Sequence, residues 1–290
     1  MKYGIYFFVL LLIFACKSKN QQQNLSVEES VSTDSSAVEI EETDDSVHFV
    51  DSVGEIKTLI FREFQEHQGD STYSHFTMLI DKEETIFQSE IRVGNLFHPK
   101  LKSAVLSWSV TDSTMDLEVF HFQNESWKSV LKSQNLPATK GGTALLSEFL
   151  LFSDYNHDGW NDLEVIIDAW DGVGYGHRSR LWLVDRASFV PVQNFEEIYC
   201  PEIDFTSKSN LIYSYYSGGC ADMAMHFAVW KMQNNSVQMI KEIDVDCCVG
   251  IGSNCAVYVN EGKPIAVPGN KVHLYVPKHF QEQLKSKMQD

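Results

Sequence analysis

Apolar residues at helical spacing open the part of the chain that has a folding pattern. The segment VGEIKTLIFREFQEHQ, residues 53–68, carries apolar side chains three or four positions apart, at Ile56, Leu59, Ile60 and Phe64. Side chains at this spacing lie on one face of a helix, and the residues between them are polar. The pattern predicts one amphipathic helix that packs its apolar face against the rest of the domain.

Strand patterns dominate from this helix to the end of the chain. Four segments combine two strand patterns with a short polar turn, at residues 76–87, 118–130, 180–192 and 226–240. Their turns, at 81–84, 123–126, 185–188 and 233–235, predict β-hairpins. Spacings of roughly 40 to 60 residues are typical of propeller blades with unequal loops, and serial hairpins also occur in antiparallel sandwiches. We expect residues 47–290 to form one all-β, mostly antiparallel, β-propeller-like domain with one N-terminal helix.

The first residues carry a short apolar stretch that ends at a cysteine. Lys2 precedes the stretch 6–14, and Ala15 and Cys16 follow it. About ten apolar residues are roughly half of a bilayer span, so a transmembrane anchor is the weaker interpretation. The segment resembles a bacterial lipoprotein signal, with IFAC at 13–16 similar to the lipobox. This resemblance implies that residues 1–15 are a signal peptide and that Cys16 carries a lipid anchor outside the cytoplasm.

Residues 16–46 are rich in Gln, Ser, Asp and Glu and contain few apolar side chains. Such a segment cannot bury enough apolar surface to offset its ordering entropy, so we expect a disordered acidic linker. An alternative is that the acidic run at 39–45 recruits a basic partner. Lys17, Ser18 and Lys19 follow the cysteine in place of the acidic residues that resemble a surface-export signal. We therefore expect anchoring at the periplasmic face of the outer membrane.

The net charge of the chain indicates which classes of binding partner are favoured. The chain carries a formal charge of −17, which disfavours nucleic acid and anionic membrane surfaces. We expect contact with the membrane through the lipid anchor only. A basic protein is the partner that this charge favours, because long-range attraction would speed its approach.

One loop has the residue types and the spacing of a calcium site. The segment DYNHDGWND, residues 154–162, places oxygen-bearing side chains at loop positions 1, 3, 5 and 9, with Gly159 at position 6. Ca²⁺ takes six to eight oxygen ligands, and a glycine allows the sharp turn that directs alternate side chains inward. The predicted ligands are Asp154, Asn156, Asp158, Asp162 and the carbonyl of Trp160. The alternative is an acidic turn, because Asp, Asn and Gly also favour turns without a metal.

The residues after this loop argue against an EF-hand. An EF-hand needs a bidentate Glu at position 12, and here that position is Val165, within the β-branched run 163–167. The loop therefore precedes a strand, and it resembles the DxDxDG loops of FG-GAP and other propeller-type repeats. The resemblance implies that the ion stabilises the fold. His157 is expected to face outward as a spacer.

Two glycine-rich segments with aromatic residues are candidates for partner binding. They read DAWDGVGYGHRSR at 168–180 and SYYSGGCAD at 214–222, and each precedes a predicted hairpin. We expect loops here, because binding residues tend to lie in loops held by a rigid β scaffold. The candidate residues are Tyr175, His177, Tyr215, Tyr216 and Ser217, although tyrosines in such folds are equally often buried.

The order of these parts resembles one group of proteins over roughly residues 100–240. A lipoprotein signal, an acidic tether, the calcium loop, LWLVDRASF at 181–189 and IYSYYSGG at 212–219 occur in sequence. This order is similar to that of calcium-binding, propeller-like periplasmic proteins that inhibit lysozyme-like muramidases and act as immunity proteins. Residues 215–218 look like the protruding inhibitory loops of periplasmic lysozyme inhibitors. Cys220 and Gly219 in this segment distinguish it from that pattern.

Five cysteines remain beside the lipidated one, at positions 200, 220, 247, 248 and 255. In an oxidising compartment they predict two disulfides and one odd thiol. Candidate pairings are Cys247 or Cys248 with Cys255, and Cys200 with Cys220. A zinc site is disfavoured, because the spacing lacks CxxC knuckles.

No local motif supplies a catalyst. GxSxG, HExxH and P-loop patterns are absent from the sequence, so we expect no enzymatic activity. A thiol-imidazole pair of Cys220 and His177 is possible in principle. The leading hypothesis is a calcium-stabilised envelope lipoprotein that binds and inhibits a protein such as a lysozyme-like cell-wall hydrolase. The alternatives are a structural subunit of an envelope complex and a glycan- or peptidoglycan-acting enzyme, whose two carboxylates leave no local motif.

Overall fold

The computed structural model describes the chain in segments between residues 53 and 287. These segments are 53–80, 86–111, 113–137, 149–170, 176–186, 188–204, 209–219, 223–248 and 254–287. They belong to one compact unit that spans Thr43–Asp290. The predicted signal peptide, the lipid anchor at Cys16 and the acidic linker at 16–46 lie outside the described residues, as do Tyr175 and Cys220.

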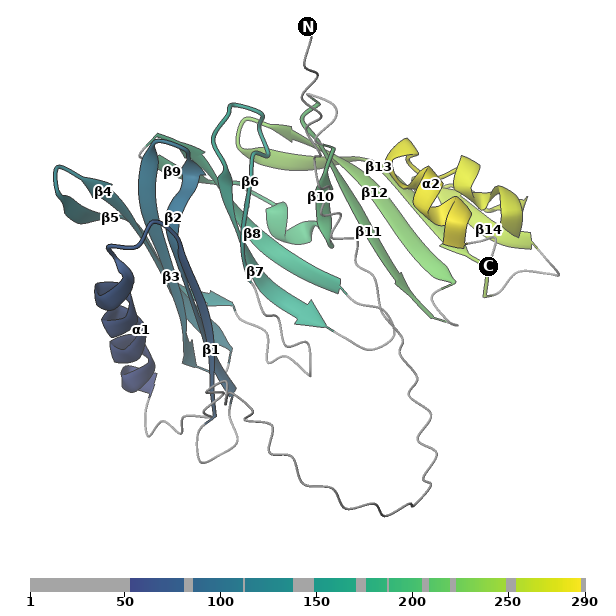
Figure 1. The fold of residues 1–290 in the computed structure, drawn as a ribbon. Coiled ribbons are helices and arrows are strands. Elements are labelled where there is room, and N and C mark those ends of the chain that lie inside the picture. The colour runs from purple at the N-terminus through teal and green to yellow at the C-terminus, as the bar shows by residue number, and fades with distance from the viewer. Residues whose placement is uncertain are drawn as a thin grey trace, which may run out of the picture. The chain divides into compact units, whose positions relative to one another are not determined.

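The N-terminal helix, α1 (Val53–His67), forms where the apolar spacing predicts it. Ile56, Ile60 and Phe64 are buried against residues of the first sheet that include Trp108, and Leu59 is partly buried beside them. Figure 1 shows α1 lying along one face of that sheet. The prediction of a single amphipathic helix at 53–68 is confirmed.

Three antiparallel sheets follow, and each one runs through consecutive strands (Figure 1). The first contains β1 (Tyr73–Ile80), β2 (Ile86–His98), β3 (Leu101–Thr111), β4 (Thr114–Gln123) and β5 (Ser126–Pro137). The second contains β6 (Leu150–Ser153), β7 (Asp162–Trp170), β8 (Gly176–Asp185) and β9 (Ser188–Pro191). The third contains β10 (Pro201–Ile203), β11 (Leu211–Gly218), β12 (Ala224–Gln233), β13 (Ser236–Asp246), β14 (Asn254–Val259) and β15 (Ile265–Pro268).

All four predicted hairpins are confirmed. They are formed by β1 and β2, β4 and β5, β8 and β9, and β12 and β13. Two of them turn through a pair of residues with positive φ, Asn124-Glu125 and Asn234-Asn235. Positive φ at both central residues gives a turn whose twist matches that of the strands, and asparagine tolerates this conformation.

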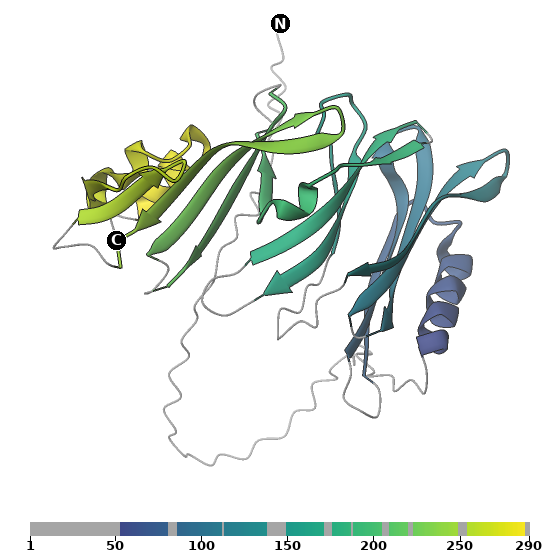
Figure 2. The same cartoon turned by 180° about the vertical axis from the view of Figure 1, so that it is seen from behind.

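The all-β class is confirmed, whereas the propeller arrangement stays a prediction. In the described part of the chain, the strand order of each sheet ends on a strand that does not pair with the first, so each sheet is open. The N-terminal helix is confirmed as α1, and the structure contains further helical segments that the sequence did not predict. Short 3₁₀ segments occur at η1 (Phe195–Glu197) and η3 (Gly269–Leu274), and a second helix, α2, spans Lys278–Lys287. It forms because Phe280 and Leu284, one turn apart, are buried against the third sheet (Figure 2).

The second sheet is buried on both faces. Leu163 and Val165 of β7 share a core with residues of the first sheet, and Leu181 and Leu183 of β8 share another with residues of the third. In keeping with this, β7 is apolar over most of its length, whereas β8 is apolar only in its second half, Leu181–Val184. The loop at 154–161 leads directly into β7, and the packed core around β7 therefore holds the end of the loop in place. Among the described helices, none is long and apolar enough to cross a membrane.

Candidate functional site

The loop between β6 and β7 is held by hydrogen bonds to its own first carboxylate. Asp154 Oδ1 accepts a bond from the backbone N–H of Asp158 at 3.1 Å, and Asp154 Oδ2 accepts one from Gly159 at 2.9 Å. Gly159 has a φ of 90° and His157 a φ of 59°, so the backbone curls around the carboxylate. The glycine at position 6 therefore allows the turn that the sequence predicts.

The middle of the loop is tied together in the same way. Asn156 Oδ1 accepts the N–H of Asp158 at 3.0 Å, and Asn156 Nδ2 donates to Asp158 Oδ2 at 2.9 Å. Asp158 Oδ1 in turn accepts the N–H of Trp160 at 2.8 Å. Three of the predicted ligands, Asp154, Asn156 and Asp158, thus order the loop through bonds to its backbone and to one another.

Asp162, the last predicted ligand side chain, is completely buried. Its Oδ2 accepts the N–H of Tyr155 and its Oδ1 accepts the N–H of Val184 in β8, both at 2.8 Å. Burial raises the pKa of Asp162 to about 7, and the negative charges of Asp158 and Asp154 add to the rise while the two backbone bonds oppose it. The side chain therefore joins the loop to the second sheet at a site where negative charge is costly.

The donor set of this loop fits a hard cation. Its side chains offer only oxygen ligands, and each carboxylate oxygen has a second lone pair beyond the backbone bond that it accepts. Within the described residues, however, Asp154, Asp158 and Asp162 are not among the groups whose potential ligand atoms all lie within 4.8 Å of one another. The three carboxylates would have to draw closer for one ion to contact them all, and the calcium site stays a prediction.

Two side chains of the loop contact other parts of the domain. His157 was expected to face outward, but it is only partly exposed and its Nε2 lies 3.2 Å from the carbonyl oxygen of Ser209. The positive φ of His157 turns its side chain toward this neighbouring segment. Trp160, expected to offer a carbonyl, stacks its indole on His98 of the first sheet with ring centroids 4.4 Å apart. The loop is therefore anchored on several sides.

A chain of buried polar contacts leads from the loop to a predicted partner-binding residue. The hydroxyl of Tyr155 donates to Glu164 Oε2 at 2.5 Å, and Glu164 Oε1 lies 3.9 Å from His177 Nε2, which is beyond hydrogen-bond distance. Burial, followed by the charge of Glu164, raises the pKa of Tyr155 well above its ordinary value. Sequence reasoning missed Tyr155 and Glu164. The available signal was a charged residue within the apolar run of β7, because a buried charge requires a partner.

The first predicted binding loop is shorter than expected. Residues 168–170 belong to β7 and residues 176–180 to β8, which leaves 171–175 between the strands. His177 is mostly buried, with a side chain that is 12% exposed, rather than on an open loop. The prediction of a loop over 168–180 is therefore wrong at both ends, because the strand pairing of Ala169 with His177 continues the ladder.

The second predicted binding loop begins later than expected. Tyr215, Tyr216 and Ser217 lie in β11, paired with Phe227, His226 and Met225 of β12. The alternation of a strand directs Tyr215 toward Phe227 and Phe280, at ring centroid distances of 5.0 and 5.8 Å, and Tyr216 toward His226 and Tyr199, at 4.8 and 5.0 Å. All three candidate side chains are partly buried. The glycines at 218 and 219 suggested a loop, but strand pairing extends to Gly218.

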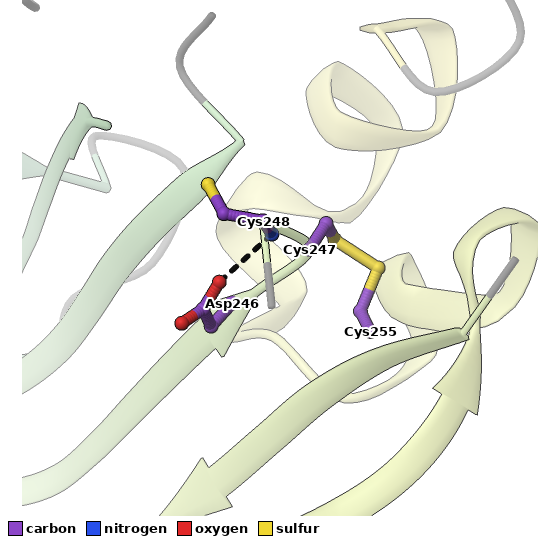
Figure 3. The surroundings of a disulfide bond; sticks show 4 residues. All are labelled: Asp246, Cys247, Cys248 and Cys255. Atoms are coloured by element: carbon purple, nitrogen blue, oxygen red, sulfur yellow. Dashed lines mark hydrogen bonds between the residues drawn. A yellow bond between two sulfur atoms is a disulfide. The ribbon is translucent and has the colours of Figure 1, made fainter. Parts of the chain in front are cut away.

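The cysteines confirm one predicted bond and exclude another. Cys247 and Cys255 form a disulfide with Cα atoms 4.1 Å apart (Figure 3). Cys248 is also disulfide-bonded. Cys200 is a buried thiol, so the predicted pairing of Cys200 with Cys220 is wrong. The backbone N–H of Cys200 bonds to the carbonyl of His177 at 2.9 Å, which holds this residue in the packed interior beside β8.

A second acidic group lies on the third sheet, where no sequence signal indicated one. His226 of β12 and two carboxylates of β13, Glu242 and Asp244, have potential ligand atoms that all lie within 4.8 Å of one another. His226 is 16 and 18 positions away from the two carboxylates in the sequence. Only the pairing of β12 with β13 brings them together.

No model of a known protein family matches the sequence, and no curated protein matches it. Among solved structures, the chain is similar to a Xanthomonas protein described as related to the type IV secretion system, at 16% sequence identity and a TM-score of 0.33. The likeness covers 66% of this chain and 92% of that chain. At this TM-score the likeness carries no argument about function.

Proposed function

We propose that this chain is a calcium-stabilised lipoprotein of the cell envelope that binds and inhibits a protein, specifically a lysozyme-like cell-wall hydrolase. In this proposal Cys16 anchors the chain to the periplasmic face of the outer membrane, and residues 16–46 act as a spacer. The observation that carries the proposal is the contact chain from the acidic loop through Tyr155 and Glu164 to His177. It joins a predicted ion site to a predicted binding segment.

The buried carboxylates explain how the loop could stabilise the binding segment. Asp162 accepts the backbone N–H groups of Tyr155 and Val184, so a change in the loop acts directly on β7 and β8. A bound Ca²⁺ would supply positive charge beside Asp162, whose pKa is raised first by burial and then by the charges of Asp158 and Asp154. The ends of β7 and β8 carry residues 171–175, which include the candidate Tyr175. Stabilising these strands would therefore hold that connection in place.

Charge and aromatic surface support a basic protein as the partner. The formal net charge of −17 would attract a basic hydrolase over a distance. Tyr199 and Tyr216 are in contact and partly exposed, and tyrosines of this kind are frequent anchors in protein interfaces. In this proposal Tyr216 or Ser217, near the end of β11, enters the hydrolase cleft and meets its catalytic acids.

Inhibition can be measured directly. The chain with Cys16→Ser, purified in Ca²⁺, is mixed with a panel of lysozyme-type enzymes, and cell-wall hydrolysis and gel-filtration profiles are recorded. We expect hydrolysis by at least one enzyme to fall and a stable complex to form. Unchanged hydrolysis across the panel, with no complex, would refute the proposal.

A pair of variants on opposite faces of β11 locates the binding surface. Tyr216→Ala removes an aromatic ring from the face that bears Tyr199, whereas Tyr213→Ala removes one from the face packed against α2. We expect Tyr216→Ala to weaken inhibition by about tenfold or more, as truncation of an interface anchor does. Tyr213→Ala is expected to lower the melting temperature but to leave inhibition intact at temperatures where it is folded. Equal inhibition by both variants would place the binding surface elsewhere.

A further inference from the structure

We propose that His226, Glu242 and Asp244 form a binding site for a divalent transition-metal ion of the zinc type, separate from the calcium loop. The strands that carry these residues bring them to one face of the third sheet. His226 of β12 lies opposite Asp244 of β13, and Ala228 lies opposite Glu242. Because side chains two positions apart on a strand share a face, both carboxylates flank the imidazole.

The ligand atoms are close to the separations that one metal ion requires. His226 Nδ1 lies 2.7 Å from Asp244 Oδ1 and 3.8 Å from Glu242 Oε1. Bonds of about 2.0 to 2.2 Å to a tetrahedral Zn²⁺ separate neighbouring ligand atoms by roughly 3.3 to 3.6 Å. Small side-chain rotations would therefore bring the three atoms into a first coordination shell without moving either strand.

Neighbouring groups hold the imidazole and the β13 backbone in place. The ring of Tyr216 stacks on His226 with centroids 4.8 Å apart, and Tyr199 packs against Tyr216 at 5.0 Å. The backbone N–H of Glu242 donates to Asn260 Oδ1 at 2.9 Å, and the N–H of Asn260 donates to the carbonyl of Glu242 at 3.0 Å. A site whose ligands are positioned before binding costs less ordering entropy when the ion arrives.

The charge of the cluster favours a dication. Among the ion pairs found in the described residues, Glu242 and Asp244 each pair with His226. Two carboxylates thus share one imidazole, which carries at most a single positive charge.

The ligand types and their exposure select the class of ion. A nitrogen ligand beside two carboxylates suits Zn²⁺ and other first-row transition metals, whereas Ca²⁺ prefers an all-oxygen set such as the loop at 154–162. The side chains of His226, Glu242 and Asp244 are 15%, 22% and 47% exposed. An ion can therefore enter from solvent, and three protein ligands leave a fourth position for water or for a ligand from a bound molecule.

The fold contains a matched control for this cluster. His279 of α2 stacks on Tyr213 at 4.5 Å, as His226 stacks on Tyr216, and its Nε2 lies 2.9 Å from Glu202 Oε2. The side chains of this pair are 22% and 30% exposed. It therefore reproduces the ring stacking and the His-carboxylate contact with one carboxylate in place of two.

The test is calorimetric titration of the full-length chain, purified without a histidine tag and stripped of metal, with ZnSO₄ as the only ligand. We expect one Zn²⁺ per chain with saturable binding, and a rise in melting temperature at saturation. His226→Gln and Asp244→Asn should each weaken Zn²⁺ binding at least about tenfold, as loss of a ligand or of its support does. His279→Gln should leave the affinity unchanged. Circular dichroism of each variant without metal shows whether it is folded. If His226→Gln is unfolded, Asp244→Asn provides the test, because Asp244 is partly exposed and its replacement should not disturb the fold.

Three results would overturn the proposal. The first is no saturable binding by the unmodified chain, and the second is equal affinity in His226→Gln, Asp244→Asn and the unmodified chain. The third is a loss in His279→Gln as large as in His226→Gln. The cluster would be no more than an ion pair if His226→Gln lowers the melting temperature while Zn²⁺ changes the melting temperature of neither the unmodified chain nor the variants. Asp158→Ala, which affects the calcium loop, should leave Zn²⁺ binding intact, so this test is independent of the proposed calcium site.

Discussion

The acidic loop of the second sheet and the His226 cluster of the third sheet gather negative charge in different ways. The loop draws its four predicted ligand side chains from nine consecutive residues, and each of them accepts a hydrogen bond from a backbone N–H of the same loop. The cluster draws on two strands, with His226 and Asp244 separated by 18 positions. A local site is recognisable from spacing alone, whereas a site built across strands exists only when the register is known.

The two regions also differ in burial. Asp162 of the loop is completely buried and accepts two backbone hydrogen bonds, while the Asp244 side chain in the cluster is 47% exposed. A buried carboxylate that satisfies backbone groups is part of the fold, and its loss should lower the stability of the folded state. A half-exposed carboxylate contributes little to the stability of the folded state, so it is available to bind a ligand. The following predictions test this difference.

Asp162→Ala should have the largest effect. It leaves the buried N–H groups of Tyr155 and Val184 without their acceptor, and each such loss costs about 1 to 3 kcal/mol. We expect the free energy of unfolding, measured by urea denaturation in chelator, to fall by about 2 to 5 kcal/mol. Asp185→Ala, at the exposed end of β8, is the control and should change it little. Comparable losses in the two variants would show that Asp162 has no special role.

Asp158→Ala should abolish the part of the stability that depends on calcium. Binding to the folded state alone adds about 2.7 kcal/mol when Ca²⁺ is at 100 times its Kd. We expect chelation to lower the melting temperature of the unmodified chain and to leave that of Asp158→Ala unchanged, as differential scanning calorimetry can show. Equal melting curves of the unmodified chain in Ca²⁺ and in chelator would contradict the calcium site.

Glu90→Gln tests a second buried carboxylate, which differs from Asp162 because it forms an ion pair with a side chain, that of Arg92. Its Oε2 accepts the N–H groups of Phe149 and Leu150, and its Oε1 lies 2.6 Å from Arg92 Nε. Burial is the largest cause that raises the pKa of Glu90 above 4.5. The folded state therefore keeps a proton that the unfolded state releases in the pH window just above 4.5, and Glu90 lowers the stability as the pH rises through that window.

The measurement is urea denaturation of both proteins across this window. The unmodified chain should lose stability relative to Glu90→Gln as the pH rises from 4.5 to the raised pKa, with a slope of at most about 1.4 kcal/mol per pH unit for one proton. Above the raised pKa the difference should become constant. A difference that does not vary with pH, or one of opposite sign, would contradict the raised pKa.

Asp244→Asn should have the smallest effect on the metal-free protein. Its carboxylate is half exposed, and exposed ion pairs contribute about 0 to 1 kcal/mol. We expect the free energy of unfolding in chelator to change by less than about 0.5 kcal/mol. A loss as large as that of Asp162→Ala would show that both regions serve the fold in the same way, and it would remove the contrast between them.

Local signals in the sequence predicted several elements of this fold. The spacing of Ile56, Ile60 and Phe64 predicted α1, and the polar turns predicted all four hairpins. Cys247 and Cys255 are eight residues apart, and their pairing was among the candidates. Each of these features depends on residues that are close in the chain. Interactions between neighbouring residues therefore decide them, and the sequence pattern is enough to predict them.

The errors share a cause, which is burial by distant segments. Helix α2 was missed because its ten residues are mostly polar and contain a short apolar repeat, Phe280 and Leu284, that becomes significant only against the third sheet. Tyr215 and Tyr216 were placed in a loop because glycines follow them, yet pairing with β12 makes them part of a strand. A disulfide was predicted for Cys200, but Cys200 is a thiol that is buried in the packed interior.

The sequence by itself determined where this chain turns, where its first helix lies and which loop gathers acidic residues, because those features follow from neighbouring residues. The tertiary structure decided that Tyr155 and Glu164 join this loop to His177, and that His226 meets Glu242 and Asp244. Contacts of this kind depend on strand register and on the packing of sheets. A shift of one residue in either strand would place the imidazole and the carboxylates on opposite faces of the sheet, so the cluster would not form.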